Sequence, residues 1–182
     1  MSLIVQIRDL REGPVTLTID HAPEFFQLED ETYSFKDKVT GEVVFTMVQR
    51  SVLARGWLET LAWTHCVRCL CDMQVHLRGN VELMYTNDPK LLEEQVDIDP
   101  IEEIFIPFEN EIIEPRDDLR ELIMIELPFL PLCKAECKGL CSQCGANLNL
   151  GVCACSQKRG LPSGEIGWKD TLRKIRLDDD GT

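Results

Sequence analysis

The sequence predicts an α+β protein: an antiparallel β-sheet or partial barrel with one short helix and a Cys-rich, metal-binding C-terminal module. Three observations support this prediction. Apolar and polar residues alternate from Asp72 to Tyr85, which indicates a strand with one buried face. One amphipathic repeat follows an acidic segment, and eight of the nine cysteines form four close pairs. A chain of 182 residues is long enough for one medium domain with a small appendage.

Residues 1–112 are predicted to form the β-rich domain. Several segments before residue 72 are rich in β-branched and aromatic residues, as strands are. The expected strands there are residues 3–7, 15–19, 42–49 and 53–64. Glu59 interrupts the apolar face of the last of them, and Gly56 is expected to mark a β-bulge there. The Cys66-x2-Cys69 pair then falls in the turn between two predicted strands.

An acidic strap, residues 87–115, follows the last predicted strand and contains four prolines that break regular structure. Residues 113–131 are predicted to carry the helix. Leu119, Leu122 and Ile123 recur on one helical face, two aspartates favour its N-terminus, and Pro128 stops it. The Cys-rich zinc module is predicted at residues 132–157. Residues 158–182 are predicted to form a basic amphipathic helix and an acidic tail.

Charge is unevenly distributed along the chain, whose formal net charge is −13. Residues 93–126 hold thirteen acidic residues against Arg116 and Arg120. Such a segment repels nucleic acid and suits a basic partner, such as a large-subunit ribosomal protein. A solvated linker is the equally open alternative. The six basic residues within 158–176 are the one part expected to be able to contact RNA, although an ordinary docked helix explains them as well.

The N-terminus lacks the basic and apolar regions of a signal peptide, and no stretch approaches the roughly 20 apolar residues of a membrane span. A cytoplasmic location without membrane contact is therefore expected. Thiols stay reduced in that compartment, so clustered cysteines favour metal binding over disulfides.

The paired cysteines have spacings that allow two thiolates to converge on one tetrahedral ion. One predicted set combines Cys141-x2-Cys144 with Cys153-x-Cys155, and the other combines the Cys66–Cys69 pair with Cys133 and Cys137. Pairings across these sets, or one shared site, remain open. Zn²⁺, one or two ions, is favoured over an iron–sulfur cluster. The eight candidate metal ligands are Cys66, Cys69, Cys133, Cys137, Cys141, Cys144, Cys153 and Cys155, which leaves Cys71 over.

Catalytic machinery is not evident in the sequence. A site closed by four cysteines leaves no position for water or substrate, the three histidines have no ligand spacing, and no phosphate-binding loop is present. A non-enzymatic protein without a small-molecule substrate is therefore expected. The alternative is a thiol-based redox or metal-handling protein that uses the cysteine pairs.

Three motifs in the chain are shared with a known family. They are Cys66-x-Arg68-Cys69-Leu70, Glu126-Leu127-Pro128 and Cys137-Lys138-Gly139-Leu140-Cys141-x2-Cys144-Gly145-x-Asn147-Leu148-Asn149. On these motifs the chain resembles the bacterial YceD-like proteins, a domain of unknown function called large ribosomal RNA subunit accumulation proteins, over residues 1–177. The resemblance implies a non-enzymatic role in accumulating 23S ribosomal RNA. It also implies a basic ribosomal protein or a pre-ribosomal particle as partner.

Overall fold

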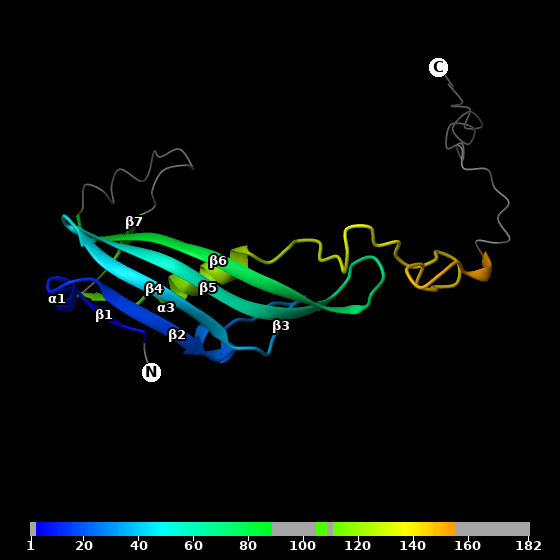
Figure 1. Cartoon of the computed structure of the whole chain (residues 1–182), viewed down its shortest axis with the longest axis horizontal. Helices are drawn as coiled ribbons and strands as arrows, with labels where there is room; N and C mark the ends of the chain where they lie inside the picture. The colour runs from blue at the N-terminus through cyan, green and yellow to red at the C-terminus, as the bar shows by residue number, and fades with distance from the viewer. Residues whose placement is uncertain (1–2, 89–104, 109–110, 156–182) are drawn as a thin grey trace, which may run out of the picture. The chain divides into compact units, whose positions relative to one another are not determined.

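The computed structural model describes residues 3–88, 105–108 and 111–155 of the chain. The chain divides into two compact units, residues 1–137 and 138–182 (Figure 1). Cys133 and Cys137 therefore belong to the first unit, and the last four cysteines belong to the second.

The first unit is built on a six-stranded sheet with the path β2-β4-β5-β6-β7, to which β3 adds by pairing with β5. The strands are β2 (Val15–His21), β3 (Ser34–Phe35), β4 (Val39–Val48), β5 (Ser51–His65), β6 (Asp72–Thr86) and β7 (Phe105–Pro107). All pairs are antiparallel except β6 with β7, which is parallel. Over the described ranges the sheet stays open and does not close into a barrel. The predicted antiparallel sheet is confirmed.

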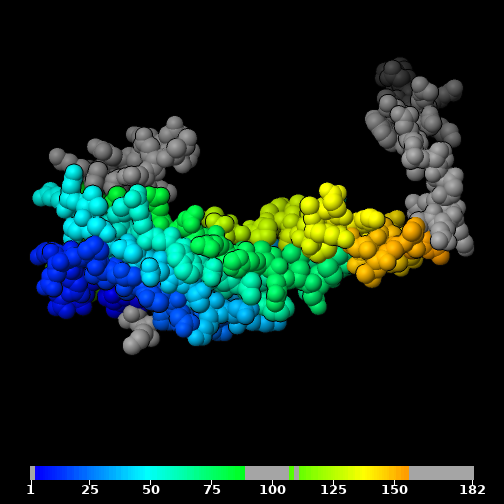
Figure 2. Space-filling model, in the orientation of Figure 1, coloured from blue at the N-terminus to red at the C-terminus, as the bar shows by residue number. Residues whose placement is uncertain are grey.

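The alternation of apolar and polar residues predicted from Asp72 to Tyr85 is confirmed in β6, which forms a hairpin with β5. Leu77, Val81 and Tyr85 are buried, while the residues between them include exposed Arg78 and Glu82. The same alternation fixes the register against β5, because a slip of one residue would move the apolar side chains to the opposite face of the sheet. Strands β4, β5 and β6 also form a broad surface of the unit (Figure 2).

Short helices cover the core face of the sheet. They are α1 (Ile7–Leu10), the 3-10 helix η1 (Pro23–Phe26) and α3 (Arg116–Ile125), and a two-stranded sheet pairs β1 (Val5–Gln6) with β8 (Ile112–Ile113). Helix α3 lies within the predicted 113–131 and packs against β5, β6 and η1. Leu119 and Ile123 are its buried residues. Leu122 is partly buried against the same core, so the predicted apolar face is the one that packs.

One polar contact joins α3 to the sheet. The Tyr85 hydroxyl donates a hydrogen bond of 2.8 Å to an Asp118 carboxylate oxygen. Burial raises the pKa of Asp118, and the hydrogen bond from Tyr85 opposes that shift. Burial, followed by the charge of Asp118, raises the pKa of Tyr85, so the phenol stays a donor.

The predicted bulge at Gly56 is wrong. The residue pairs in unbroken register with Val43 on one side and Val81 on the other. Glycine is needed there because a Cβ atom would collide with the backbone carbonyl oxygen of Glu42. Gly41 faces the same constraint from the carbonyl oxygen of Trp57. A glycine within a strand marks either a bulge or a close approach of backbones, and here the close approach of β4 and β5 applies.

Three predicted segments lie partly or wholly outside the described residues. These are 89–104 and 109–110 of the acidic strap, 156–157 of the Cys-rich module, and all of 158–182, where the basic helix and acidic tail were expected. Within the strap, residues 105–107 form β7 beside the end of β6. In the described part of the chain, no helix has the length and apolarity that a membrane crossing requires.

Replacing Gly56 by alanine tests the close approach of β4 and β5. We expect Gly56→Ala to lower the free energy of unfolding by about 3 kcal/mol, because backbone atoms must move to admit the methyl group. The matched control is Gly79→Ala in β6, whose Cβ would meet nothing nearer than 3.7 Å. It should change that free energy by less than about 1 kcal/mol. Urea denaturation of both variants measures the difference, and equal effects would contradict the argument.

Candidate metal centres

The connection between β5 and β6 forms a tight cysteine-bearing turn. The Cys66 N–H donates to the Cys71 carbonyl at 2.9 Å, and the Leu70 N–H donates to the Cys66 carbonyl at 2.9 Å. Leu70 adopts a left-handed backbone with φ of 57°. The turn buries the side chains of Cys66 and Cys69 without interrupting the β5–β6 ladder, which ends at His65 and Asp72.

A second segment, residues 131–137, is hydrogen-bonded to this turn. The Val67 N–H donates to the Pro131 carbonyl at 3.0 Å, and Arg68 Nη1 donates to the Cys137 carbonyl at 2.8 Å. Further back, the Tyr33 hydroxyl donates to the Pro128 carbonyl. These bonds bring Cys133 and Cys137 beside residues more than sixty positions earlier in the sequence.

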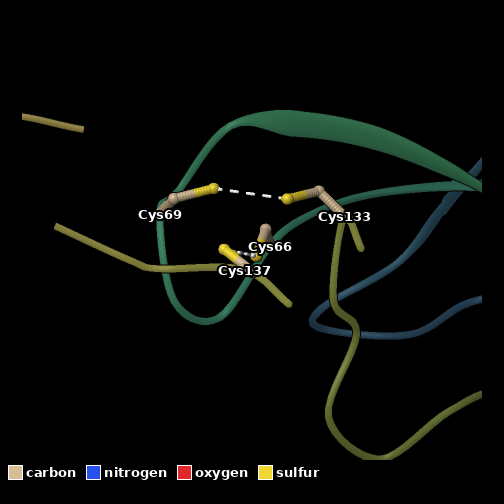
Figure 3. Close-up of side chains that lie close together, drawn as sticks. All are labelled: Cys66, Cys69, Cys133 and Cys137. Atoms are coloured by element: carbon tan, nitrogen blue, oxygen red, sulfur yellow. Dashed lines mark hydrogen bonds between the residues drawn. The ribbon is translucent and has the colours of Figure 1, made fainter. Parts of the chain in front are cut away.

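The first cysteine group therefore consists of Cys66, Cys69, Cys133 and Cys137, whose sulfur atoms all lie within 4.8 Å of one another (Figure 3). Cys66 Sγ is 3.7 Å from Cys137 Sγ, and Cys69 Sγ is 3.6 Å from Cys133 Sγ. Four thiolates about 2.3 Å from a tetrahedral zinc ion stand about 3.8 Å apart. The group therefore has the size of a four-thiolate zinc site.

Backbone amides prepare two of these thiols to bind a cation. The N–H of Cys133 lowers the pKa of Cys66 to about 6, aided by the N–H groups of Cys69 and Arg68 and opposed by burial. The N–H of Cys71 is the main cause that lowers the pKa of Cys69. Burial raises the pKa of Cys133. Thiolate, rather than thiol, is the metal-binding form, so the two lowered values favour metal entry.

The second cysteine group lies in the second unit and consists of Cys141, Cys144, Cys153 and Cys155, again with all sulfur atoms within 4.8 Å. The Gly145 N–H donates to the Cys141 carbonyl at 2.9 Å, and the Cys141 N–H donates to the Ala146 carbonyl at 2.8 Å. Gly145 adopts φ of 70°, a left-handed conformation that glycine takes without strain. The result is a knuckle that points the first two thiols toward the last two.

Electrostatics in the second group follow the same pattern as in the first. The backbone N–H groups of Gln143 and Cys144 lower the pKa of Cys141 to about 6. The pKa of Cys144 rises to about 11: the Ala146 N–H stabilises its thiolate, but the neighbouring thiols of Cys141 and Cys155 together with burial outweigh it. Each group thus contains at least one thiol with a lowered pKa, which favours the thiolate form that binds a divalent cation.

Two asparagines brace the second group. Asn149 Oδ1 accepts the Lys138 N–H at 2.9 Å, and Asn147 Oδ1 accepts the Asn149 N–H at 2.9 Å. In the sequence these two asparagines and Arg68 were recognised only as members of the motifs shared with the YceD-like proteins. Their positioning roles depend on tertiary contacts, and no pattern in the sequence indicates which carbonyl or amide each one reaches.

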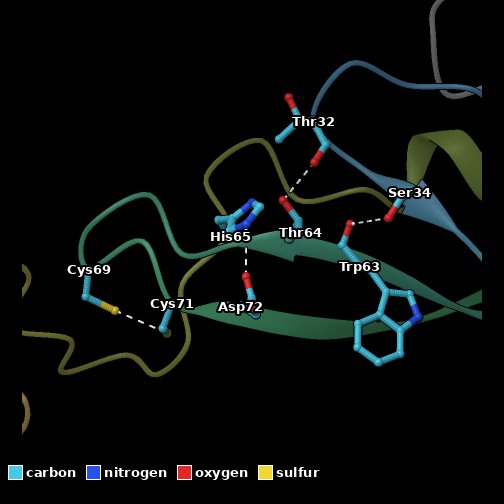
Figure 4. Close-up of polar contacts among 8 residues, drawn as sticks. All are labelled: Thr32, Ser34, Trp63, Thr64, His65, Cys69, Cys71 and Asp72. Atoms are coloured by element: carbon cyan, nitrogen blue, oxygen red, sulfur yellow. Dashed lines mark hydrogen bonds and ion pairs between the residues drawn. The ribbon is translucent and has the colours of Figure 1, made fainter.

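The structure brings all eight candidate ligands together in the two sets that their spacing suggested. Over the described ranges, no other group of three or more His, Cys, Asp or Glu side chains has a metal-binding arrangement. His65 bonds Asp72 at 2.9 Å instead, and His76 lies 3.5 Å from Glu59 (Figure 4 shows His65 and Asp72). Cys71, which spacing left unassigned, lies beside the first group at 3.3 Å from Cys69 Sγ.

These features define an open antiparallel sheet protein with two four-cysteine groups that could each hold a metal ion. Residues 54–168 match the family model described as "Large ribosomal RNA subunit accumulation protein YceD". This range covers more than half of the chain and includes both cysteine groups, and the chain belongs to the YceD family.

Curated relatives span two kinds of organism. An uncharacterized protein of Mycobacterium leprae is 29% identical over 104 residues, covering 56% of this chain and 45% of that protein. The chloroplastic large ribosomal RNA subunit accumulation protein YCED homolog 1 of Arabidopsis thaliana is 26% identical over 125 residues, covering 57% of this chain and 39% of that one. The maize protein of the same name is also 26% identical. The chain spans less than half of each of these relatives, and no solved structure matches it.

Elemental analysis tests the two groups separately. We expect the purified protein to carry two zinc ions per chain. Cys66→Ser and Cys153→Ser should each remove one ion and the double variant both, because loss of one thiolate opens a single four-ligand cage. Cys71→Ser is the matched control and should retain both ions. If either ligand variant alone emptied both sites, the two-site arrangement would be wrong.

Proposed function

We propose that this protein supports the accumulation of 23S ribosomal RNA and the assembly of the large ribosomal subunit, and that it acts by binding. Membership of the YceD family is the observation that carries this proposal. The plant relatives named for the same role agree with it. Both cysteine groups contain four thiols and so offer no open coordination position, which supports a non-catalytic role.

The proposal assigns one structural Zn²⁺ to each cysteine group. Zinc suits an all-thiolate tetrahedral cage and has no redox chemistry of its own. An iron–sulfur cluster uses the same ligands but needs room for its inorganic sulfides. Sulfur separations of 3.6 and 3.7 Å in the first group suit one small ion better. In this role the first ion fastens the segment 131–137 to the end of the β5–β6 hairpin.

The second proposed ion is expected to contribute more to folding than the first. No apolar side chain within residues 138–155 belongs to the buried core, and Leu150 and Val152 are 88% and 76% exposed. Such a segment gains too little from apolar burial to offset the loss of chain entropy. Binding of zinc by four cysteines contributes about 10 kcal/mol or more to folding of small domains. The metal is therefore proposed to hold residues 138–155 in shape.

The proposed partner is a basic ribosomal protein or a pre-ribosomal particle. Thirteen acidic residues in 93–126 support a cationic client, because a dense field of one sign speeds and orients encounter with the opposite charge. A direct RNA contact through 158–176 is a separate proposal that rests on the six basic residues of that segment. It predicts binding that weakens steeply with salt.

Removal of metal should affect the two units differently. A strong chelator is expected to abolish amide protection in residues 138–155, while β4, β5 and β6 keep theirs because an apolar core holds them. Hydrogen exchange measured by mass spectrometry on peptides from each region reports both outcomes. The untreated protein is the control. Protection of 138–155 that survives complete metal removal would exclude the structural role proposed for the second ion.

Depletion of the protein in its source cells tests the proposed function. We expect the ratio of 23S to 16S ribosomal RNA to fall and the 50S peak in sucrose gradients to shrink. Expression of the wild-type chain should restore both. The double variant Cys66→Ser, Cys69→Ser should restore them less well, whereas Cys71→Ser should match the wild type under reducing growth. An unchanged RNA ratio and 50S peak after depletion would refute the proposal.

A further inference from the structure

A fifth thiol lies against the first cysteine group. Cys71 Sγ is 3.3 Å from Cys69 Sγ, closer than either of the sulfur pairs measured within the group (Figure 4). Its position is fixed from both sides. The Cys71 carbonyl accepts the Cys66 N–H at 2.9 Å, and β6 begins at the next residue, Asp72. The thiol is therefore held beside a metal-binding residue.

Cys71 is surplus to a tetrahedral site. The sulfur atoms of the other four cysteines already enclose one ion-sized space, and Cys71 is outside that set. Its side chain is half-buried, so a small solute can reach it, whereas Cys69 behind it is only 5% exposed. A partly exposed thiol in contact with a buried one is placed to be oxidised first and then resolved by its neighbour.

We propose that Cys69 and Cys71 form a peroxide-sensitive pair, in which oxidation joins the two sulfurs as a disulfide and takes one ligand away from the first metal site. The metal part of this inference rests on the zinc site proposed above. The sulfur atoms, 3.3 Å apart, must approach to about 2.05 Å, the length of a disulfide bond. The modification would remove one of the two hairpin thiolates from the site that links the hairpin to residues 131–137.

The chemistry balances with hydrogen peroxide as the oxidant. The accessible Cys71 sulfur attacks one peroxide oxygen, the O–O bond breaks, and water leaves with the thiol proton, so that Cys71 becomes a sulfenic acid. The Cys69 thiolate then attacks the Cys71 sulfur, the S–O bond breaks, and hydroxide leaves. The two cysteines lose two electrons, and one peroxide yields one water and one hydroxide. A disulfide sulfur is a poor zinc ligand, so the ion is left with three thiolates.

The second cysteine group is an internal control. The chain has nine cysteines, and Cys71 is the one that belongs to neither group of four. The second group therefore has no spare thiol that could be oxidised and then joined to one of its ligands. Mild oxidation should open the first site before the second.

The experiment treats the full-length, zinc-loaded protein with hydrogen peroxide. Zinc release is followed with a colorimetric chelator, and disulfides are mapped by peptide mass spectrometry. We expect release of one ion per chain, a disulfide between Cys69 and Cys71, and recovery of zinc binding after reduction. Cys71→Ser should release this ion roughly tenfold more slowly, because it lacks the accessible thiol that peroxide oxidises first. Cys155→Ser, which alters the second group, should leave the Cys69–Cys71 disulfide unchanged.

Two results would overturn the inference. One is release of the first ion at the same rate from the wild type and Cys71→Ser. The other is a wild-type disulfide that joins Cys69 to Cys133, or any pair without Cys71. Failure of the zinc assignment is seen separately, as absence of zinc from the untreated protein. Disulfide mapping does not need the metal and still decides whether Cys69 and Cys71 form the reactive pair.

Discussion

The pairing of β5 with β6 is the constraint on which the rest of the structure depends. Fifteen consecutive residue pairs, from Ser51–Thr86 to His65–Asp72, run without a break. β5 also carries β4 along its other edge, and its core-facing side chains pack beneath α3. A ladder of this length leaves little freedom at its end, so the turn that follows His65 is held in one place. The first cysteine group is built on that turn.

The two units illustrate two ways to stabilise a chain. In the first, apolar side chains from the strands and α3 form a continuous buried core, and the cysteine group only fastens its edge. In the second, residues 138–155 contribute no apolar side chain to that core and rely on hydrogen-bonded turns and four thiols. Metal coordination suits the second case, because it concentrates stabilisation in a few residues.

The turn between β5 and β6 also places Cys71, the thiol proposed to be oxidised, next to the candidate metal ligands Cys66 and Cys69. The backbone bonds that bury Cys66 and Cys69 fix Cys71 as well, since its carbonyl accepts one of them. The candidate metal ligands and the proposed oxidant-sensitive pair therefore share the same few residues. In the proposed switch, the fifth thiol competes with the metal for Cys69 only in the presence of an oxidant.

The sequence by itself determined the period-two strand at Asp72–Tyr85 and the helix around Leu119 and Ile123, because these follow from local periodicity. Its three motifs also carried the resemblance to the YceD family. It offered Gly56 as a bulge, since a glycine does not reveal whether a neighbouring backbone approaches. It also left the cysteine pairing open and Cys71 unassigned. Only the tertiary structure decided these points. The role of Gly56 depends on the close approach of β4 and β5, and the cysteine grouping depends on the hydrogen bonds from Val67 and Arg68 that bring the segment 131–137 to the hairpin end. Contacts between residues so far apart in the chain leave no local pattern.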